Sequence, residues 1–199
     1  MATKDYTKEY QQIFKQHIKR DGADKLLGYI KESDFFTCPA STKYHGNHAG
    51  GLVEHSVKVY ERFCKVLEAE YGAEYFKKNP DMAESAAVIA LLHDICKIGC
   101  YKTEERNVKV GAEWVKKPYF AYDDPLPYGH GEKSVYMISG FMRLSREEAM
   151  AINWHMGGYD ARNHSGGYIT SDAFTKFPLA LLFHAADLMT SYLDESIAK

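Results

Sequence analysis

The sequence predicts an all-α protein, a bundle of about seven helices with one small β excursion. Apolar residues recur at three- and four-residue spacing along most of the chain, which is typical of amphipathic helices. Residues 101–127 are the only credible sheet: β-branched and aromatic residues there alternate with charged ones, which suggests a hairpin or an irregular excursion. The chain has 199 residues and no repeat or linker-like segment, so we expect one domain with a sizeable core.

Residues 1–40 are expected to form the N-terminal helices. Apolar residues at helical spacing predict one helix around 6–14 and a second around 26–30. The small and turn-forming residues of 37–51 predict an ordered loop. The helix expected next, over 52–71, has two apolar sides, which indicates a central position in the bundle.

The later helices carry start signals. Asn79 followed by Pro80 predicts a capped, proline-started helix that is rich in alanine and apolar nearly all round, so it should be the core element. Ser145 and Glu148 have the spacing of a capping box and predict the start of another helix. The last helix is expected to begin either at Asp172 or just before Pro178.

The composition narrows the class of protein. A formal net charge of -2 gives no overall basic field for a long nucleic acid, so an anionic substrate must be bound by local residues. The polar N-terminus and the absence of an apolar run of roughly 18 residues argue against a membrane protein. We expect the four cysteines to be reduced thiols, as in a cytoplasmic protein. They are Cys38, Cys64, Cys96 and Cys100.

Two stretches place ionisable residues in apolar surroundings. His93 and Asp94 end the run AAVIALLHDICKI, and Asp187 lies within PLALLFHAADLM. A carboxylate in such surroundings needs a charged partner or a metal ion. With His55 upstream, these residues make a mixed nitrogen and oxygen ligand set of the kind that Mn, Fe, Co, Ni or Zn accepts. The sequence therefore predicts a metal site; the alternative is a buried charge network without metal.

The order H…HD…D resembles the HD-domain metal-dependent phosphohydrolases. The contexts YHGNHAGGLVEHSVKV, LLHDICKI and LALLFHAADLM are similar to the HD domain of bacterial 3′-to-5′ exoribonucleases and of related phage and Firmicute hydrolases. The resemblance implies a single HD domain over 1–199, an HD-domain helical bundle with its metal-binding core in 44–194. The exoribonucleases also carry a nucleic-acid-binding OB domain, which has no counterpart here, and this argues against processive RNA binding.

The family pattern with extra histidines implies a second metal. The implied ligands of the two ions are His55, His93, Asp94, His130, His155 and Asp187. The alternative for His130 and His155 is an ordinary role at the end of a helix. The cofactor is then one or two divalent ions, and the sequence does not distinguish Mn, Fe, Ni, Co, Zn or Mg.

The chemistry of such a centre suggests a role for individual residues. Two ions about 3.5 to 4 Å apart hold the attacking and leaving oxygens of a phosphoryl transfer, and Asp94 is the expected bridge. Lys97, three residues further on, is expected either to stabilise charge on a phosphate oxygen or to be an ordinary cation at a helix end. Arg162 could bind a phosphate or be solvated. His45 and His48 are expected to line the entrance.

The leading hypothesis is a cytoplasmic phosphohydrolase or phosphodiesterase in which metal-activated water attacks the phosphorus of a nucleotide or short oligonucleotide. One alternative is a di-iron oxygenase, because some members of the same fold with six such ligands hold a mixed-valent di-iron centre. Another is a non-catalytic metal- or nucleotide-binding regulatory module. The excursion mixes cations with aromatic rings, a composition that could stack a base and attract its phosphate. The alternative is a solvated face. The cations are Lys102, Arg106, Lys109, Lys116 and Lys117, and the rings are Tyr101, Trp114, Tyr119 and Phe120.

Overall fold

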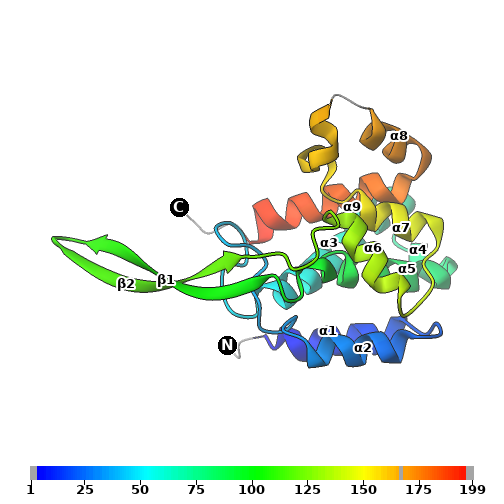
Figure 1. Cartoon of the computed structure of the whole chain (residues 1–199). Helices are drawn as coiled ribbons and strands as arrows, with labels where there is room; N and C mark the ends of the chain where they lie inside the picture. The colour runs from blue at the N-terminus through cyan, green and yellow to red at the C-terminus, as the bar shows by residue number, and fades with distance from the viewer. Residues whose placement is uncertain (1–3, 166–167, 196–199) are drawn as a thin grey trace.

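Helices dominate the computed structural model, which describes residues 4–165 and 168–195 (Figure 1). This confirms the predicted all-α class with a small hairpin. The α-helices of the described ranges are α1 (Tyr6–His17), α2 (Ala23–Glu32), α3 (Gly51–Tyr71), α4 (Tyr75–Lys78), α5 (Pro80–Leu92), α6 (Gly131–Ser139), α7 (Arg146–Asn153), α8 (Ile169–Lys176) and α9 (Pro178–Met189).

Shorter turns connect these helices. Three 3₁₀ turns span Ile95–Lys97, Gly157–Tyr159 and Ala161–Ser165, and a π-helical turn, Thr190–Asp194, follows α9. The structure has two α-helices more than the seven expected. α4 is a single turn, and α8 is separated from α9 because Pro178 cannot continue the hydrogen bonding of the preceding helix.

α5 is the centre of the core. It begins at Pro80, as predicted, and every residue of 86–92 is fully buried. α1, α3 and α7 pack against it, and α9 packs against α3 and α7, so the N-terminal helices share the core of the rest. Each large aliphatic side chain buried there contributes about 1.5–3 kcal/mol. Within the described ranges, no helix combines the length and the hydropathy of a membrane span.

The predicted capping box at the start of α7 is confirmed. The Ser145 hydroxyl accepts a bond from the Glu148 N–H, and the Glu148 carboxylate accepts one from the Ser145 N–H. The buried Glu148 carboxylate also accepts two bonds from Arg20, at 2.7 and 2.9 Å, and one from the Ser85 hydroxyl at 2.7 Å. Glu148 therefore links α7 to α5 and to the segment between α1 and α2.

The β excursion is an antiparallel hairpin that projects away from the helices (Figure 1). Strand β1 (Tyr101–Val110) pairs with β2 (Glu113–Tyr122). Gly111, with a positive φ of 64°, begins the two-residue turn between them, a conformation that favours glycine. The strands end at Tyr122, earlier than the expected limit of 127.

Candidate metal centre

Asp94 is the point at which the predicted ligands converge. It follows α5 directly, and its side chain is only 3% exposed. Oδ2 lies 3.4 Å from Nε2 of His93 and 3.8 Å from Nε2 of His55, which is on α3. Oδ1 lies 3.0 Å from Nε2 of His130, just before α6, and 3.7 Å from Nε2 of His155, just after α7. Each carboxylate oxygen thus faces its own pair of imidazoles.

The remaining predicted ligand, Asp187, is on α9. Its Oδ1 lies 3.2 Å from Nε2 of His55, which places it at the same centre as Asp94. Atoms bound to one ion at about 2.0–2.2 Å are roughly 3 Å or slightly more from one another. The spacing of these side chains is therefore close to that of a coordination shell. The structure brings together all six predicted residues, from α3, the end of α5, the start of α6, the end of α7 and α9.

Hydrogen bonds orient two of the imidazoles. Nδ1 of His93 donates to the carbonyl of Ala90 at 2.9 Å, and Nδ1 of His155 donates to the carbonyl of Ile152 at 2.7 Å. A carbonyl can only accept, so in each neutral ring the proton is on Nδ1 and the lone pair is on Nε2. Both lone pairs are therefore directed at the Asp94 carboxylate.

Buried polar atoms that lack a hydrogen-bond partner indicate whether a cation fits at this centre. Within the described residues, Nε2 of His93, Nε2 of His155 and Oδ1 of Asp94 are buried and have no hydrogen-bond partner. Leaving such a group unsatisfied costs about 1–3 kcal/mol. All three atoms offer lone pairs and face one another, so one or more cations between them would satisfy every one. The residues fit a divalent metal.

Among the described residues, four clusters at the centre have the spacing of a metal site. Within each cluster the potential ligand atoms lie within 4.8 Å of one another. The clusters are His55, His93 and Asp94; His93, His155 and Asp187; Asp94, Cys96 and His130; and His45, His55 and Glu195. Cys96 was not among the expected ligands, and its Sγ lies 3.3 Å from Nδ1 of His130.

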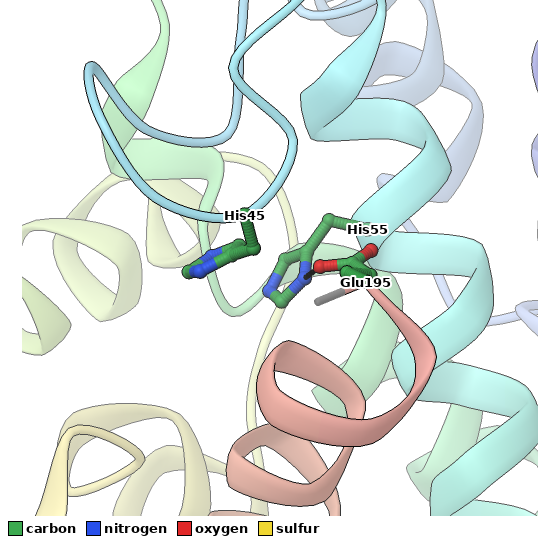
Figure 2. A group of neighbouring side chains, drawn as sticks. All are labelled: His45, His55 and Glu195. Atoms are coloured by element: carbon green, nitrogen blue, oxygen red, sulfur yellow. Dashed lines mark hydrogen bonds and ion pairs between the residues drawn. The ribbon is translucent and has the colours of Figure 1, made fainter. Parts of the chain in front are cut away.

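Glu195 is a further residue of the centre, and sequence reasoning did not single it out. It follows the π-helical turn, its side chain is 3% exposed, and its Oε2 accepts a hydrogen bond of 2.9 Å from Nδ1 of His55. Figure 2 shows Glu195 and His45 on either side of this imidazole, with the ring centroids of His45 and His55 4.8 Å apart. Carboxylates commonly orient metal-binding histidines in this way. No local pattern marks Glu195, because its partner is 140 positions away.

The two histidines expected at the entrance lie differently. His45 packs on His55, and burial, followed by the charges of His55 and Lys97, lowers the pKa of His45 to about 4. His48 is exposed, and its Nε2 lies 3.4 Å from Glu54. Only His45 of this pair therefore belongs to the centre.

Lys97 contacts both the Asp94 carboxylate and the main chain. Its Nζ lies 2.6 Å from Oδ2 of Asp94 and 2.7 Å from the carbonyl of Ala40. Burial alone would lower the pKa of Lys97, but the Asp94 carboxylate outweighs it and the pKa is raised. Burial would likewise raise the pKa of Asp94, but Lys97 and the surrounding imidazoles hold it well below its usual range. The two groups therefore keep each other charged.

The other charges of the centre leave an excess of carboxylates. Burial would lower the pKa of His55, but Asp187 and Glu195 outweigh it and raise that pKa to about 10. The pKa of Asp187 is lowered, because His55 more than offsets the effect of burial. A cation bound at Nε2 of His55 would displace that proton, and with neutral imidazoles the carboxylates of Asp94, Asp187 and Glu195 exceed the ammonium of Lys97 by two charges. This excess equals the charge of one divalent cation.

Arg162 is held within the protein. Its guanidinium lies 2.6 Å from Asp160 and 2.7 Å from Glu132, and it stacks on the ring of Trp154 at 3.8 Å. These contacts attach the loop after α7 to the start of α6. The expectation that Arg162 binds a phosphate stays a prediction.

The comparisons with known proteins identify the family. A family model described as the HD domain matches residues 52–187, a range that begins just before His55 and ends at Asp187. No curated protein and no solved structure matches the chain. The match is to the domain family as a whole, so the finer resemblance to exoribonucleases is not supported. The chain therefore belongs to the HD domain family, the metal-dependent phosphohydrolase superfamily whose H…HD…D ligands it carries.

Proposed function

We propose that this protein is a metal-dependent phosphohydrolase or phosphodiesterase that acts on a nucleotide or a short oligonucleotide. One observation carries the proposal: each oxygen of the buried Asp94 carboxylate faces a separate pair of imidazoles. This is the arrangement that a carboxylate bridging two cations requires. When bound, divalent ions supply a water of lowered pKa and positive charge for the phosphoryl oxygens.

The residues that would hold the ions are the six predicted ones. On one side of the Asp94 carboxylate they are His55 and His93, and on the other His130 and His155, with Asp187 completing the set. Glu195 orients His55 through its hydrogen bond to Nδ1. The mixture of nitrogen and oxygen ligands suits Mn, Fe, Co, Ni or Zn.

Lys97 is assigned to the substrate phosphate as well as to Asp94. An ammonium has three N–H donors, and two of them bind Asp94 and the carbonyl of Ala40. The third donor is available for a non-bridging phosphate oxygen. Because the side chain of Lys97 is only 12% exposed, this charge acts where it is weakly screened by solvent.

The exposure of the ligands indicates where a substrate approaches. His55, His93, Asp94 and His155 have side chains that are at most 3% exposed. His130 at 29% and Asp187 at 15% are the most exposed of the set. We therefore expect a phosphate to reach the centre past His130 or Asp187, because the other four predicted ligands are almost fully buried.

The test is a metal-dependence assay. Purified protein is stripped with a chelator, reloaded with Mn, Fe, Co, Ni, Zn or Mg, and offered bis(p-nitrophenyl) phosphate and a panel of nucleotides. We expect stripping to abolish turnover and at least one metal to restore it, and we expect His93→Ala to be inactive with every metal. His48→Ala, which changes an exposed histidine outside the centre, is the control and should retain activity. No turnover by the wild type with any metal would contradict the proposal.

A second candidate is oxidative chemistry at a di-iron centre. The placement of both His130 and His155 near Oδ1 of Asp94 favours it, because it gives the centre four imidazoles and two carboxylates. Anaerobic reduction of iron-loaded protein followed by EPR distinguishes the two: a mixed-valent signal supports the oxygenase, and a redox-silent centre with phosphatase activity excludes it. Tight binding of a nucleotide that is recovered unchanged would instead indicate a non-catalytic module.

A further inference from the structure

The β1–β2 hairpin is the feature of the fold that the proposed centre leaves unexplained. It projects from the bundle (Figure 1), and no residue of either strand is buried. A two-stranded hairpin with no covering layer is at best marginally stable in water. Packing within this chain therefore does not account for two strands of ten residues each.

The hairpin concentrates positive charge on an acidic protein. Its strands carry five cationic and three acidic side chains, whereas the whole chain has a formal net charge of -2. Arg106 and Lys117 are directly opposite each other in the strand register, an arrangement of like charges that is destabilising. Within the described residues, neither of them, nor Lys109, forms an ion pair with a carboxylate. An anionic partner would relieve this repulsion.

The hairpin also presents an exposed aromatic ring among these cations. Trp114 is 69% exposed and is opposite Lys109, and Lys116, two residues further on, shares its face. On the other face the Arg106 guanidinium lies 5.2 Å from the ring centre of Tyr119. Because the ribbon is only two strands wide, about 5 Å between strands, cations of both faces are within reach of one polyanion.

The root of the hairpin reaches the metal centre. The Tyr101 hydroxyl donates to the carbonyl of Ala40, the same carbonyl that binds Nζ of Lys97. Trp114 and Lys109 lie on the same face of the hairpin as Tyr101 and its partner Tyr122. They are eight residues further along the strands, a distance of about 26 Å at 3.3 Å per residue. A ligand held along this face would therefore have one end near Lys97.

We propose that the hairpin is a binding arm for a short single-stranded nucleic acid, with Trp114 stacking on a base and Arg106, Lys109 and Lys117 binding the backbone phosphates. Stacking rings interleaved with cations is the recurring composition of such surfaces. The inference rests on the proposed function and narrows its substrate class to oligonucleotides. A second copy of this chain would bury the same ring, and the oligomeric state measured below distinguishes that outcome.

The test is fluorescence anisotropy with a labelled oligothymidylate of about ten nucleotides, its backbone phosphorothioate to resist hydrolysis. We expect Trp114→Ala to weaken binding by about 5- to 160-fold, the range that loss of one stacked base produces. Replacing Arg106 and Lys117 together by glutamate should weaken binding and reduce the slope of log affinity against log salt by about 1.4 if two phosphate contacts are lost.

Matched controls change exposed residues elsewhere. Replacing Lys77 and Lys176 together by glutamate makes the same change in charge on α4 and α8, and Tyr71→Ala removes an exposed ring at the end of α3. Both controls should bind as the wild type does, and circular dichroism checks that every variant is folded. Equal binding by all variants, or no binding by the wild type, would overturn the inference.

Three further outcomes separate this inference from a contact between copies and from the proposed function. If light scattering shows a dimer that Trp114→Ala converts to a monomer, and the oligonucleotide does not bind, the ring belongs to a contact between copies and the inference is wrong. Turnover of bis(p-nitrophenyl) phosphate without oligonucleotide binding overturns the hairpin's role and leaves the proposed function standing. Binding that depends on the hairpin, without turnover of any phosphate, supports the arm and contradicts the hydrolase.

Discussion

The carboxylate of Glu195 accepts a 2.9 Å hydrogen bond from Nδ1 of His55, while Nε2 of the same ring faces Asp187 at 3.2 Å. The imidazole is therefore held between an orienting carboxylate and the candidate ligands. This contact joins the π-helical turn to α3, so we expect the metal affinity of the centre to depend on a residue outside the six predicted ligands.

Replacing Glu195 should weaken metal binding without abolishing it. We expect Glu195→Ala to lower the affinity by about 10- to 100-fold, because the orientation of His55 is lost. Glu195→Gln keeps an acceptor for Nδ1 and should show a smaller loss. Competition with a chromophoric chelator measures both, with Glu70→Gln on the exposed end of α3 as the control. An unchanged affinity of Glu195→Ala would show that the hydrogen bond does not position the ligand.

Lys97 should contribute to turnover rather than to metal content. Lys97→Ala removes the ammonium assigned to the phosphate, and we expect kcat to fall by about 100-fold or more, as on loss of a positioned donor. Elemental analysis should find the same metal content as in the wild type. If kcat is unchanged, Lys97 serves only to pair with Asp94 and Ala40.

His130 should bind one of two ions. Its side chain is the most exposed of the six at 29%, so His130→Ala should remain folded. The protein should lose one metal equivalent, measured by elemental analysis after dialysis, and keep the equivalent on the side of His55 and His93. Retention of two equivalents would contradict the assignment of His130.

Glu148 should make stability depend on pH in the acid range. Burial would raise its pKa, but Arg20, the Ser145 N–H and Ser85 outweigh it and lower the pKa below the usual 4.5. A carboxyl group whose pKa is lowered by folding stabilises the protein above its unfolded pKa, and this contribution is lost as the pH falls through the folded value. Glu148→Gln should therefore cost about 1–3 kcal/mol of unfolding free energy at pH 7, and the difference from wild type should shrink below about pH 4.5.

Urea denaturation of chelator-treated protein at several pH values measures this difference. The neighbouring Glu147→Gln is the matched control, because burial raises the pKa of Glu147. Its ionised form opposes folding, so this substitution should be neutral or stabilising at pH 7. A constant difference between Glu148→Gln and wild type from pH 7 down to pH 3 would contradict the assigned role of Glu148.

The sequence by itself determined the helical class, the hairpin, the capping box at Ser145 and the buried pair His93-Asp94 with Asp187, whereas His130 and His155 were implied by the family resemblance. Each of the derived features depends on residues that are close in sequence. Helical periodicity extends over a few turns, a capping box spans four residues, and an aspartate within an apolar run can be identified from its neighbours alone. The separation of α8 from α9 was missed because Asp172 and the residues before Pro178 were taken as alternative starts of one helix, whereas each lies in a helix of its own.

Only the tertiary structure decided how the ligands are shared and supported. The division of the Asp94 oxygens between two pairs of imidazoles depends on the packing of four helices, and the pairing of Glu195 with His55 joins residues 140 positions apart. The ion pairs of Arg162 with Asp160 and Glu132 likewise depend on how the loop after α7 folds back. Spacing along the chain carries no information on such contacts, because they depend on packing between elements rather than on the period within one.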